Sequence, residues 1–410
     1  ACALVASSED VRGVFPPVCG LRGTVQELIA VGGQDKRKAR VDLVGQGDQA
    51  HATKLPLAVP EGEFRQVVAR EDHGTLTFMI PGAFSSQSAT NASGQAAARS
   101  MSDHEIVEDI HRLKREKNAI ILAHYYQQPE IQELADFVGD SLGLAQAADK
   151  TGAEVILFAG VHFMAETAKI LNPGRTVLLP DLNAGCSLAD SAPPEKFRAF
   201  LDQHPDHVVV SYINCSAEVK AMSDIICTSS NAVRVVQSIP ADRKVIFAPD
   251  KHLGAYVQRI TGRELVLWDG VCEVHVDISL DKMKFLLGKH PDAKLVAHPE
   301  CPPHILAEAD HIGSTTSLLD FVQRDPGNTF IVATEGGILH KMRQAVPGKT
   351  LIAAPANVEN SCACSECPYM KMNTLAKVHS ALLTGSPEII LEERIRAGAE
   401  VALRRMMDLG

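Results

Sequence analysis

The sequence predicts an α/β protein built from three repeated units, each a parallel sheet between two layers of helices, arranged about a pseudo-threefold axis. From residue 119 onward, apolar strand-like runs alternate with helical patterns, which is typical of βαβ units. The same order of elements occurs three times, and at least one cysteine follows the last strand of each repeat. Because parallel α/β units place ligand groups at the carboxyl ends of their strands, the repeats predict one central cavity that receives groups from all three units.

Each repeat opens with an apolar strand that ends in polar residues, and the three strands share one register. They read "IILAHYYQQ", "VVVSYINCS" and "KLVAHPECP". A hydroxyl residue follows the leading polar residue by 17 positions in each repeat, giving the pairs His124 and Ser141, Tyr212 and Ser229, and His298 and Thr315. Two positions after the leading residues come Tyr126, Asn214 and Glu300.

The residue types at these positions suit acid–base chemistry on a small anionic substrate. Histidine, tyrosine and glutamate side chains can transfer protons or hold carboxylates. We expect catalytic roles for His124, Tyr126, Tyr212, His298 and Glu300. The hydroxyl residues Ser141, Ser229 and Thr315 resemble helix N-caps, which would direct three helix N-termini at the cavity. Such an arrangement favours a substrate with several negative groups.

The last strand of each repeat is followed by cysteine: Cys186, Cys272, and the group Cys362, Cys364 and Cys367. One thiolate from each unit would reach the central cavity. Three thiolates on a shared axis suit an iron–sulfur cluster or a zinc ion. A [4Fe–4S] cluster held by three cysteines leaves one iron without a protein ligand, and that iron can act as a Lewis acid.

The repeats also divide the chain into segments. We expect an N-terminal extension and linker at 1–100, three α/β repeats at 101–190, 191–277 and 278–372, and C-terminal helices at 373–410. The first segment carries strand-like pieces such as "KARVDLV" and "TLTFMI", and residues 85–100 are small and polar, as in a linker. Met101 begins a helix-like stretch. Nothing in residues 1–100 indicates a function.

Composition excludes several classes of protein. A net charge of −10 argues against a nucleic-acid partner. The chain has no apolar run of the roughly eighteen residues that a membrane span requires, and no secretory signal pattern. Ten cysteines in 410 residues do not form the dense pattern of a disulfide scaffold. We therefore expect a cytoplasmic protein with small-molecule substrates and no membrane partner.

Several stretches from about residue 104 to 410 resemble the quinolinate synthase A family of bacterial NAD biosynthesis. They are "AHYYQQPEIQELADFVGDSL", "FMAETAKILNP", "VLLPDLNAGCSLAD", "YINCSAEVKA", "CTSSNA", "DGVCEVH", "AHPEC", "GSTTSLL", "ATEGGILHKM" and "CPYMKMN". The resemblance implies condensation of iminoaspartate with dihydroxyacetone phosphate to quinolinate, with release of phosphate and water, and a functional link to L-aspartate oxidase. It also implies a central [4Fe–4S] cluster on Cys186, Cys272 and Cys367.

The resemblance further implies a set of substrate-binding residues. They are His124, Ser141, Tyr212, Asn214, Ser229, His275, His298, Glu300 and Thr315. Two features depart from the family pattern. Ser361 occupies the place of the first cysteine in the C-x-x-C-x-x-C found in some members, and residues 1–100 have no counterpart.

Other interpretations stay open from the sequence. An aconitase-type hydro-lyase also uses a three-cysteine cluster, an iron–sulfur sensor or electron carrier would use the metal without catalysis, and a structural zinc site would use the terminal cysteines. Cys364 and Cys367 could also form a redox disulfide. Cys215, Cys227 and Cys301 are interpreted as packing residues.

Overall fold

The computed structural model describes the strands within residues 1–97 as backbone, and residues 101–357 and 365–409 in full. The chain divides into two compact units, Ala1–Ala97 and Ala98–Gly410, which are described separately. The linker predicted at 85–100 and the cysteines Cys362 and Cys364 lie outside the described residues. The segment boundaries expected from the repeats stay predictions.

The first unit contains a six-stranded sheet in the order β1-β4-β5-β6-β3-β2. β1 pairs with β4 in parallel, and all other neighbours are antiparallel. The strands are β1 (Leu4–Val5), β2 (Thr24–Val31), β3 (Lys38–Val44), β4 (Lys54–Ala58), β5 (Arg65–Asp72) and β6 (Thr75–Met79). β3 and β6 coincide with the predicted pieces "KARVDLV" and "TLTFMI", so these two predictions are confirmed.

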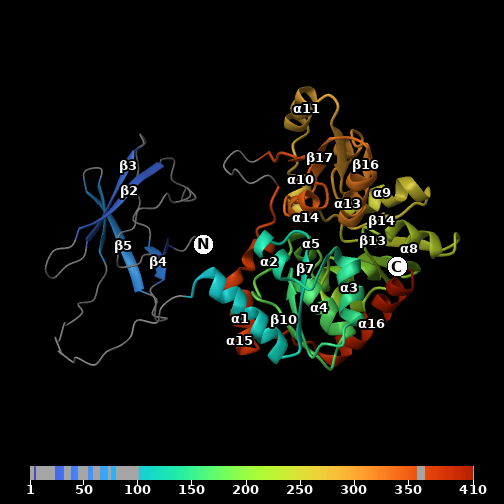
Figure 1. Ribbon diagram of the computed structural model, residues 1–410, viewed down its shortest axis with the longest axis horizontal. Coiled ribbons are helices and arrows are strands. Elements are labelled where there is room, and N and C mark those ends of the chain that lie inside the picture. The colour runs from blue at the N-terminus through green and yellow to red at the C-terminus, as the bar shows by residue number, and fades with distance from the viewer. Residues whose placement is uncertain are drawn as a thin grey trace. The chain divides into compact units, whose positions relative to one another are not determined.

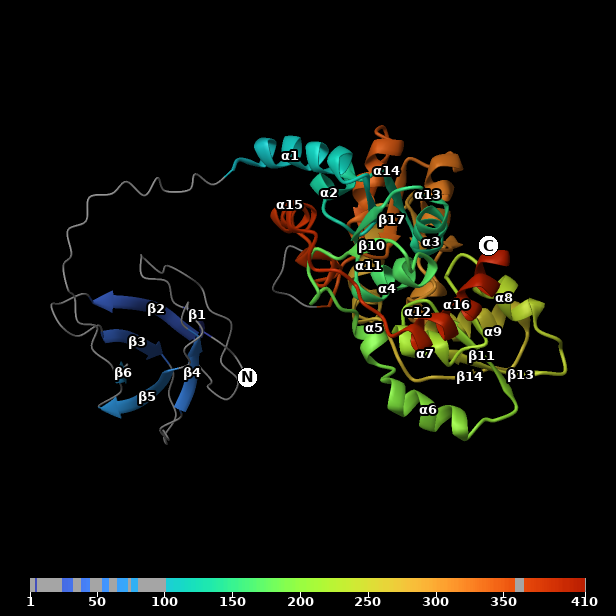
Figure 2. The same cartoon turned by 90° about the horizontal axis from the view of Figure 1, so that it is seen from below.

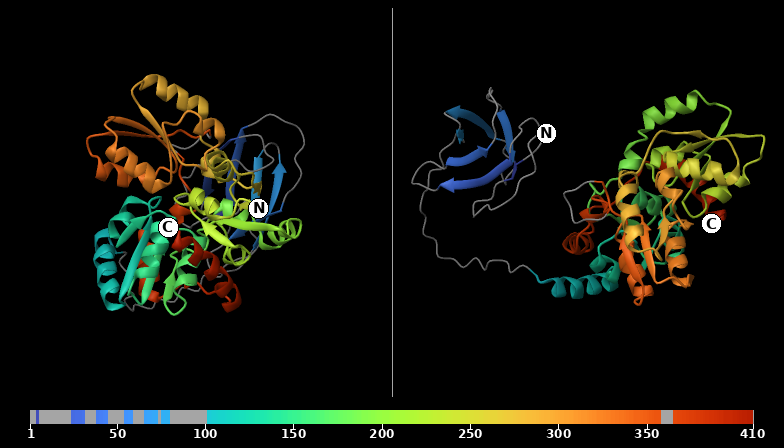
Figure 3. Two further views of the ribbon diagram at one scale, coloured as in Figure 1. Left: turned by 90° about the vertical axis from the view of Figure 1, so that its right-hand side faces the viewer. Right: turned by 90° about the horizontal axis from the view of Figure 1, so that it is seen from above.

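The second unit contains three parallel four-stranded sheets, which form three separate lobes in Figure 3 (left). Each sheet has the same strand order: β8-β7-β9-β10, β12-β11-β13-β14 and β16-β15-β17-β18. The strands of the first two sheets are β7 (Ala119–His124), β8 (Phe137–Gly139), β9 (Val155–Ala159), β10 (Thr176–Leu178), β11 (His207–Tyr212), β12 (Ile225–Cys227), β13 (Lys244–Ala248) and β14 (Val266–Leu267). Those of the third are β15 (Lys294–Ala297), β16 (His311–Ile312), β17 (Thr329–Ala333) and β18 (Thr350–Ala353). The α/β class and the threefold repetition of the parallel sheet are confirmed.

The strand register repeats as closely as the strand order. In the first pairing of each sheet, the partners are Leu122 with Phe137, Val210 with Ile225, and Val296 with His311. In the second, they are Ala123 with Ala159, Ser211 with Ala248, and Ala297 with Ala333. The strands are short, apolar and largely buried because helices cover both faces of each parallel sheet. Equivalent strands therefore end at equivalent places, and the residues after them occupy matching positions.

Helices connect the strands and close the unit (Figure 1). Those up to the second sheet are α1 (Asp103–Glu116), α2 (Pro129–Leu134), α3 (Ser141–Lys150), α4 (His162–Leu171), α5 (Ser187–Asp190), α6 (Pro194–Asp202), α7 (Ala217–Ala221), α8 (Ala232–Ser238) and α9 (Lys251–Thr261). The remainder are α10 (Glu273–Val276), α11 (Leu280–Lys289), α12 (Pro303–Leu306), α13 (Thr315–Arg324), α14 (Ile338–Ala345), the 3₁₀ turn η1 (Met370–Met372), α15 (Leu375–Thr384) and α16 (Glu393–Asp408). Within the described part of the chain, we find no helix with both the length and the apolar character that crossing a membrane requires.

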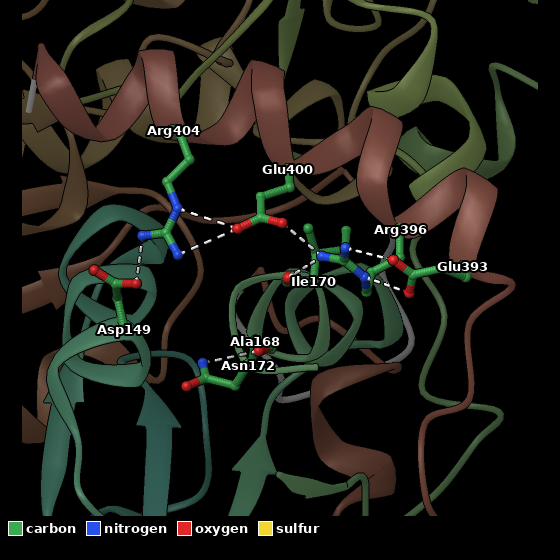
Figure 4. A network of polar contacts seen from close by, with 8 residues as sticks. All are labelled: Asp149, Ala168, Ile170, Asn172, Glu393, Arg396, Glu400 and Arg404. Carbon is green, nitrogen blue, oxygen red and sulfur yellow. Dashed lines mark hydrogen bonds and ion pairs between the residues drawn. The ribbon is translucent and has the colours of Figure 1, made fainter. Parts of the chain in front are cut away.

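The first and last helices join segments that are distant in sequence. α1 begins where the sequence predicts a helix, and a reciprocal capping box between Ser102 and Glu105 fixes its start. It packs beside α15, as Figure 2 shows. α16 packs on α4 of the first sheet and on α7 and β12 of the second. On α16, Arg396 binds Glu393, Glu400 and the carbonyl oxygen of Ile170 near the end of α4 (Figure 4).

The prediction that Ser141, Ser229 and Thr315 are N-caps is wrong. The cap of α3 is Asp140, whose carboxylate accepts the N–H of Gly143 at 2.9 Å, and the cap of α13 is Ser314. α8 begins after Asn231, so Ser229 lies in the preceding turn. The sequence places two capping-type residues side by side, and the structure uses the first of them at α3 and α13.

Candidate functional site

One cavity lies at the carboxyl ends of the strands of all three sheets. Its lining combines apolar side chains with a few convergent polar groups, which is typical of a small-molecule site. All of the side chains predicted for the site line this cavity: His124, Tyr126, Ser141, Cys186, Tyr212, Asn214, Ser229, Cys272, His275, His298, Glu300, Thr315 and Cys367. They lie near or after the first, second or last strand of each sheet in chain order, so the shared register is what brings them together.

The three cysteines occupy similar local structures. Cys186 directly precedes α5, Cys272 directly precedes α10, and Cys367 precedes η1. In each case, backbone N–H groups two or three positions ahead lie near the sulfur and favour its thiolate form. Burial has the larger effect and raises the pKa of all three thiols, that of Cys367 to about 11. These thiols are free, and they stay protonated at neutral pH unless a metal cation replaces the proton on sulfur.

Other described cysteines lie away from this set. Cys215, Cys227 and Cys301 are fully buried among apolar side chains and do not line the cavity. Their interpretation as packing residues is confirmed by this placement.

Glu300 lies beside two imidazoles in the cavity wall. Its Oε2 is 2.7 Å from His275 Nδ1 and 3.8 Å from His298 Nδ1, and both rings are buried and stacked with centroids 4.9 Å apart. Burial alone would raise the pKa of Glu300, but the two histidines and the nearby Tyr212 hydroxyl outweigh it and lower the pKa to about 2. Glu300 is therefore a carboxylate at neutral pH. Its other oxygen, Oε1, has no hydrogen-bond partner within the protein.

A chain of polar contacts runs from Glu300 to Tyr126 across the cavity wall. His275 Nε2 lies 2.8 Å from Thr334 Oγ1, which lies 2.6 Å from the Tyr126 hydroxyl. The chain begins at Glu300, whose Oε2 lies 2.7 Å from His275 Nδ1 and, as part of a carboxylate, has no proton to donate. The Thr334 hydroxyl therefore joins the His275 ring to the Tyr126 hydroxyl. Burial, followed by the charge of Glu300, raises the pKa of Tyr126 well above 10, which keeps that hydroxyl protonated.

His124 and His298 occupy equivalent positions and have the same backbone contact. The N–H of Tyr126 donates to His124 Nδ1 at 3.2 Å, and the N–H of Glu300 donates to His298 Nδ1 at 3.4 Å. The neutral rings therefore carry their protons on Nε2. Burial is the main cause that lowers the pKa of His124 to about 4 and that of His298 to about 3. Both rings are neutral hydrogen-bond donors at neutral pH.

The hydroxyl residues are free to act as ligands because they are not caps. Ser229 Oγ lies 3.1 Å from His298 Nε2, and Ser141 and Thr315 line the same cavity from the starts of α3 and α13. Asn214 Oδ1 is buried with no hydrogen-bond partner within the protein. Buried polar atoms are normally satisfied, so the open oxygens of Asn214 and Glu300 indicate a polar ligand.

Sequence reasoning missed Thr334, Glu335 and Lys371. Glu335 lines the cavity wall and forms an ion pair with Lys371. Thr334 and Glu335 follow β17 directly, at positions equivalent to Gly160 and Val161 after β9. The repeat register could have located these positions, but the residue types differ between repeats and gave no common chemical signal.

A second arrangement of ligand atoms lies within the same cavity. Cys272, His275 and Glu300 each offer one ligand atom, and these three atoms lie within 4.8 Å of one another, as in a site for a single metal ion. Cysteine, histidine and carboxylate are all zinc ligands. Cys272 therefore belongs both to the three-cysteine set and to this mixed set.

Three parallel α/β sheets whose strand ends supply buried acid–base groups and thiols to one cavity define an enzyme of the α/β class. Residues 108–408 match the model of the family described as quinolinate synthetase A protein. The chain is 58% identical over 306 residues to a quinolinate synthase of Gloeothece citriformis, covering 75% of this chain and 94% of that protein. It is 59% identical over 300 residues to a quinolinate synthase of Nostoc punctiforme, covering 73% and 92%. It is 56% identical over 315 residues to a quinolinate synthase of Microcystis aeruginosa, covering 77% and 98%. The chain belongs to the quinolinate synthase A family.

Proposed function

We propose that this enzyme condenses iminoaspartate with dihydroxyacetone phosphate to form quinolinate, releasing one phosphate and two waters, in NAD biosynthesis. The observation that carries the proposal is the polar chain from Glu300 through His275 and Thr334 to Tyr126, which joins all three sheets around one cavity. An L-aspartate oxidase would supply the iminoaspartate. The names of the relatives support the product.

We also propose that Cys186, Cys272 and Cys367 hold a [4Fe–4S] cluster, and that the three sheets are arranged about a pseudo-threefold axis. The fit rests on three free thiols that line one cavity, each near backbone N–H groups that favour a thiolate. When bound, the cluster would supply a Lewis-acidic iron that has no protein ligand. The other residues would bind and orient the substrates around it.

The chain's own residues divide into hydrogen-bond donors and a base. The neutral Nε2–H groups of His124 and His298 would donate to substrate oxygens, and the Ser141 and Thr315 hydroxyls would bind the carboxylates and the phosphate. Glu300, held as a carboxylate, would accept the proton that leaves carbon during condensation. The Tyr126 hydroxyl would bind a substrate oxygen, and Thr334 and His275 would hold that hydroxyl in position.

The test begins with protein purified without oxygen, analysed for iron, sulfide and zinc. We expect iron and sulfide in the ratio of a [4Fe–4S] cluster, and quinolinate when dihydroxyacetone phosphate and freshly generated iminoaspartate are added. Glu300→Gln should retain the cluster and lose turnover by about 100-fold or more, whereas Glu308→Gln, which changes an exposed carboxylate, should not. No quinolinate from cluster-loaded protein would refute the proposed reaction.

The mixed set of Cys272, His275 and Glu300 supports an alternative to the cluster, in which the cavity binds a single zinc ion. The same metal analysis decides between the two. A colourless protein with one zinc and no iron would refute the cluster, whereas an aconitase-type hydro-lyase or a sensor would hold the cluster and make no quinolinate.

A further inference from the structure

Glu335 is a buried carboxylate whose contacts join its own loop to the segment that presents Cys367. It directly follows Thr334 at the end of β17, and its side chain is 1% exposed. Oε1 accepts the backbone N–H of Cys367 at 3.1 Å and lies 3.1 Å from Lys371 Nζ. Oε2 accepts the backbone N–H of Gly337 at 2.7 Å. The carboxylate thus ties the loop after β17 to the peptide group of a cysteine 32 positions later.

Lys371 extends this contact to the first sheet. Its Nζ donates to the carbonyl oxygen of Tyr126 at 2.8 Å while it binds Glu335. A Cβ added to Gly337 would lie 2.8 Å from both the Tyr126 backbone and Glu335 Oε2, so only glycine permits this approach. The motifs "ATEGG" and "PYMKM" therefore meet at the backbone of Tyr126, whose side-chain hydroxyl contacts Thr334.

Comparison between the sheets shows that this arrangement is not a general feature of the repeat. The residues equivalent to Glu335 are Val161 after β9 and Asp250 after β13. Asp250 is also buried, but its carboxylate caps α9 through the N–H of Leu253 at 2.6 Å. Among the described contacts, Asp250 has no ion pair with a lysine or arginine. Of these three equivalent positions, only that in the third sheet combines a carboxylate with a partly buried cation.

We propose that Glu335 and Lys371 are a positioning pair that holds Cys367 in place for the cluster and fixes it relative to Tyr126. This inference rests on the proposed cluster. A buried pair is costly to break on one side only, because the remaining charge is left uncompensated. Partners in contact with metal ligands typically change metal affinity by about 10–100-fold when they are altered.

The experiment compares Glu335→Gln, Lys371→Met and the double variant, each purified without oxygen. Iron loss to a chelator should be about 10-fold faster in either single variant than in the unaltered protein. It should be slower in the double variant than in either single variant, because that variant has no unpaired buried charge and the amide oxygen of the introduced glutamine still accepts the Cys367 N–H. Lys377→Met, which breaks the more exposed pair with Asp181, is the matched control and should lose iron at the normal rate.

The reduction potential separates an electrostatic positioning pair from general loosening of the fold. Removing the negative charge of Glu335 should raise the midpoint potential, and removing the positive charge of Lys371 should lower it, since reduction adds negative charge to the cluster. A shift of both single variants in the same direction would overturn the inference, as would single variants that retain iron like the unaltered protein. If the unaltered protein holds no iron, the proposed cluster fails first and this inference fails with it.

Discussion

The cavity and the C-terminal helix both contain ionisable side chains in contact with one another, but with different consequences. In the cavity, His275 and Glu300 are 2% and 3% exposed, and burial changes the pKa of most titratable groups around them. On α16, Arg404 pairs with Asp149 and Glu400 near the surface, where the Arg404 side chain is 44% exposed (Figure 4). Solvent screens the surface pairs, so each pair adds little to the free energy of unfolding and acts only on the attachment of one helix. The buried groups, in contrast, fix charges and protons at defined atoms. Altering the cavity should therefore change chemistry, and altering α16 should change stability slightly.

The largest effect expected in this comparison follows from Cys272→Ala. Removing one of three thiolates should abolish the cluster and quinolinate formation, because two sulfurs cannot satisfy its irons. Iron and sulfide per chain and quinolinate formation measure the loss. Cys227→Ala is the matched control, since Cys227 is buried on the same sheet but does not line the cavity. Retention of the cluster and full turnover by Cys272→Ala would show that the ligand assignment is wrong.

Thr334→Val should have the next largest effect. The substitution keeps the shape of the side chain and removes the hydroxyl that joins Tyr126 to His275. We expect kcat to fall by about 10-fold with an unchanged iron content, since a single hydrogen-bonded link is lost and the ligands stay in place. Thr334→Ser restores the hydroxyl and should recover most of the activity. Unchanged kcat in Thr334→Val would show that the polar chain does not contribute to turnover.

The sequence predicts which residues meet in the cavity better than it predicts how they contact one another. His124, Tyr212 and His298 could be placed together because a repeat register requires only that equivalent strands end at equivalent points. Contacts between different sheets have no such periodicity. The bond from Tyr126 to Thr334 joins residues 208 positions apart and has no equivalent that the register could reveal.

The N-cap prediction shows the same limit at short range. Asp140 and Ser141 can both accept an N–H, and so can Ser314 and Thr315. The choice depends on which residue has extended backbone, and the sequence does not encode that in residue type alone. The correction matters for the site, because it frees the hydroxyl of the second residue for a ligand.

Acid should destabilise the protein partly through His124. Its pKa is lowered to about 4 by burial, compared with 6.5 in an exposed ring. The unfolded chain therefore binds more protons than the folded chain between these values, and this contribution to stability is complete above pH 6.5 and is lost as the pH falls toward 4. Between pH 7.5 and 5.5, we expect His124 to account for about 1 kcal/mol of the lost free energy of unfolding.

Urea unfolding at the two pH values measures this difference. His124→Gln should lose less stability on acidification than the unaltered protein, whereas His104→Gln, which changes an exposed ring, should lose as much. An equal loss in all three proteins would show that His124 is not buried in neutral form.

The smallest effect should come from Arg404→Ala on α16. This side chain is partly exposed, so removing its pair with Asp149 should lower the free energy of unfolding by only about 0.2–1 kcal/mol and leave quinolinate formation unchanged. Arg396→Ala should lower the free energy of unfolding by more than Arg404→Ala. The Arg396 side chain is only 12% exposed, binds Glu393 through two nitrogens and donates to the Ile170 carbonyl near the end of α4. Urea unfolding of both variants tests the order. If Arg404→Ala changed kcat as strongly as Thr334→Val, charge on α16 would influence the cavity, and the contrast between the two regions would not hold.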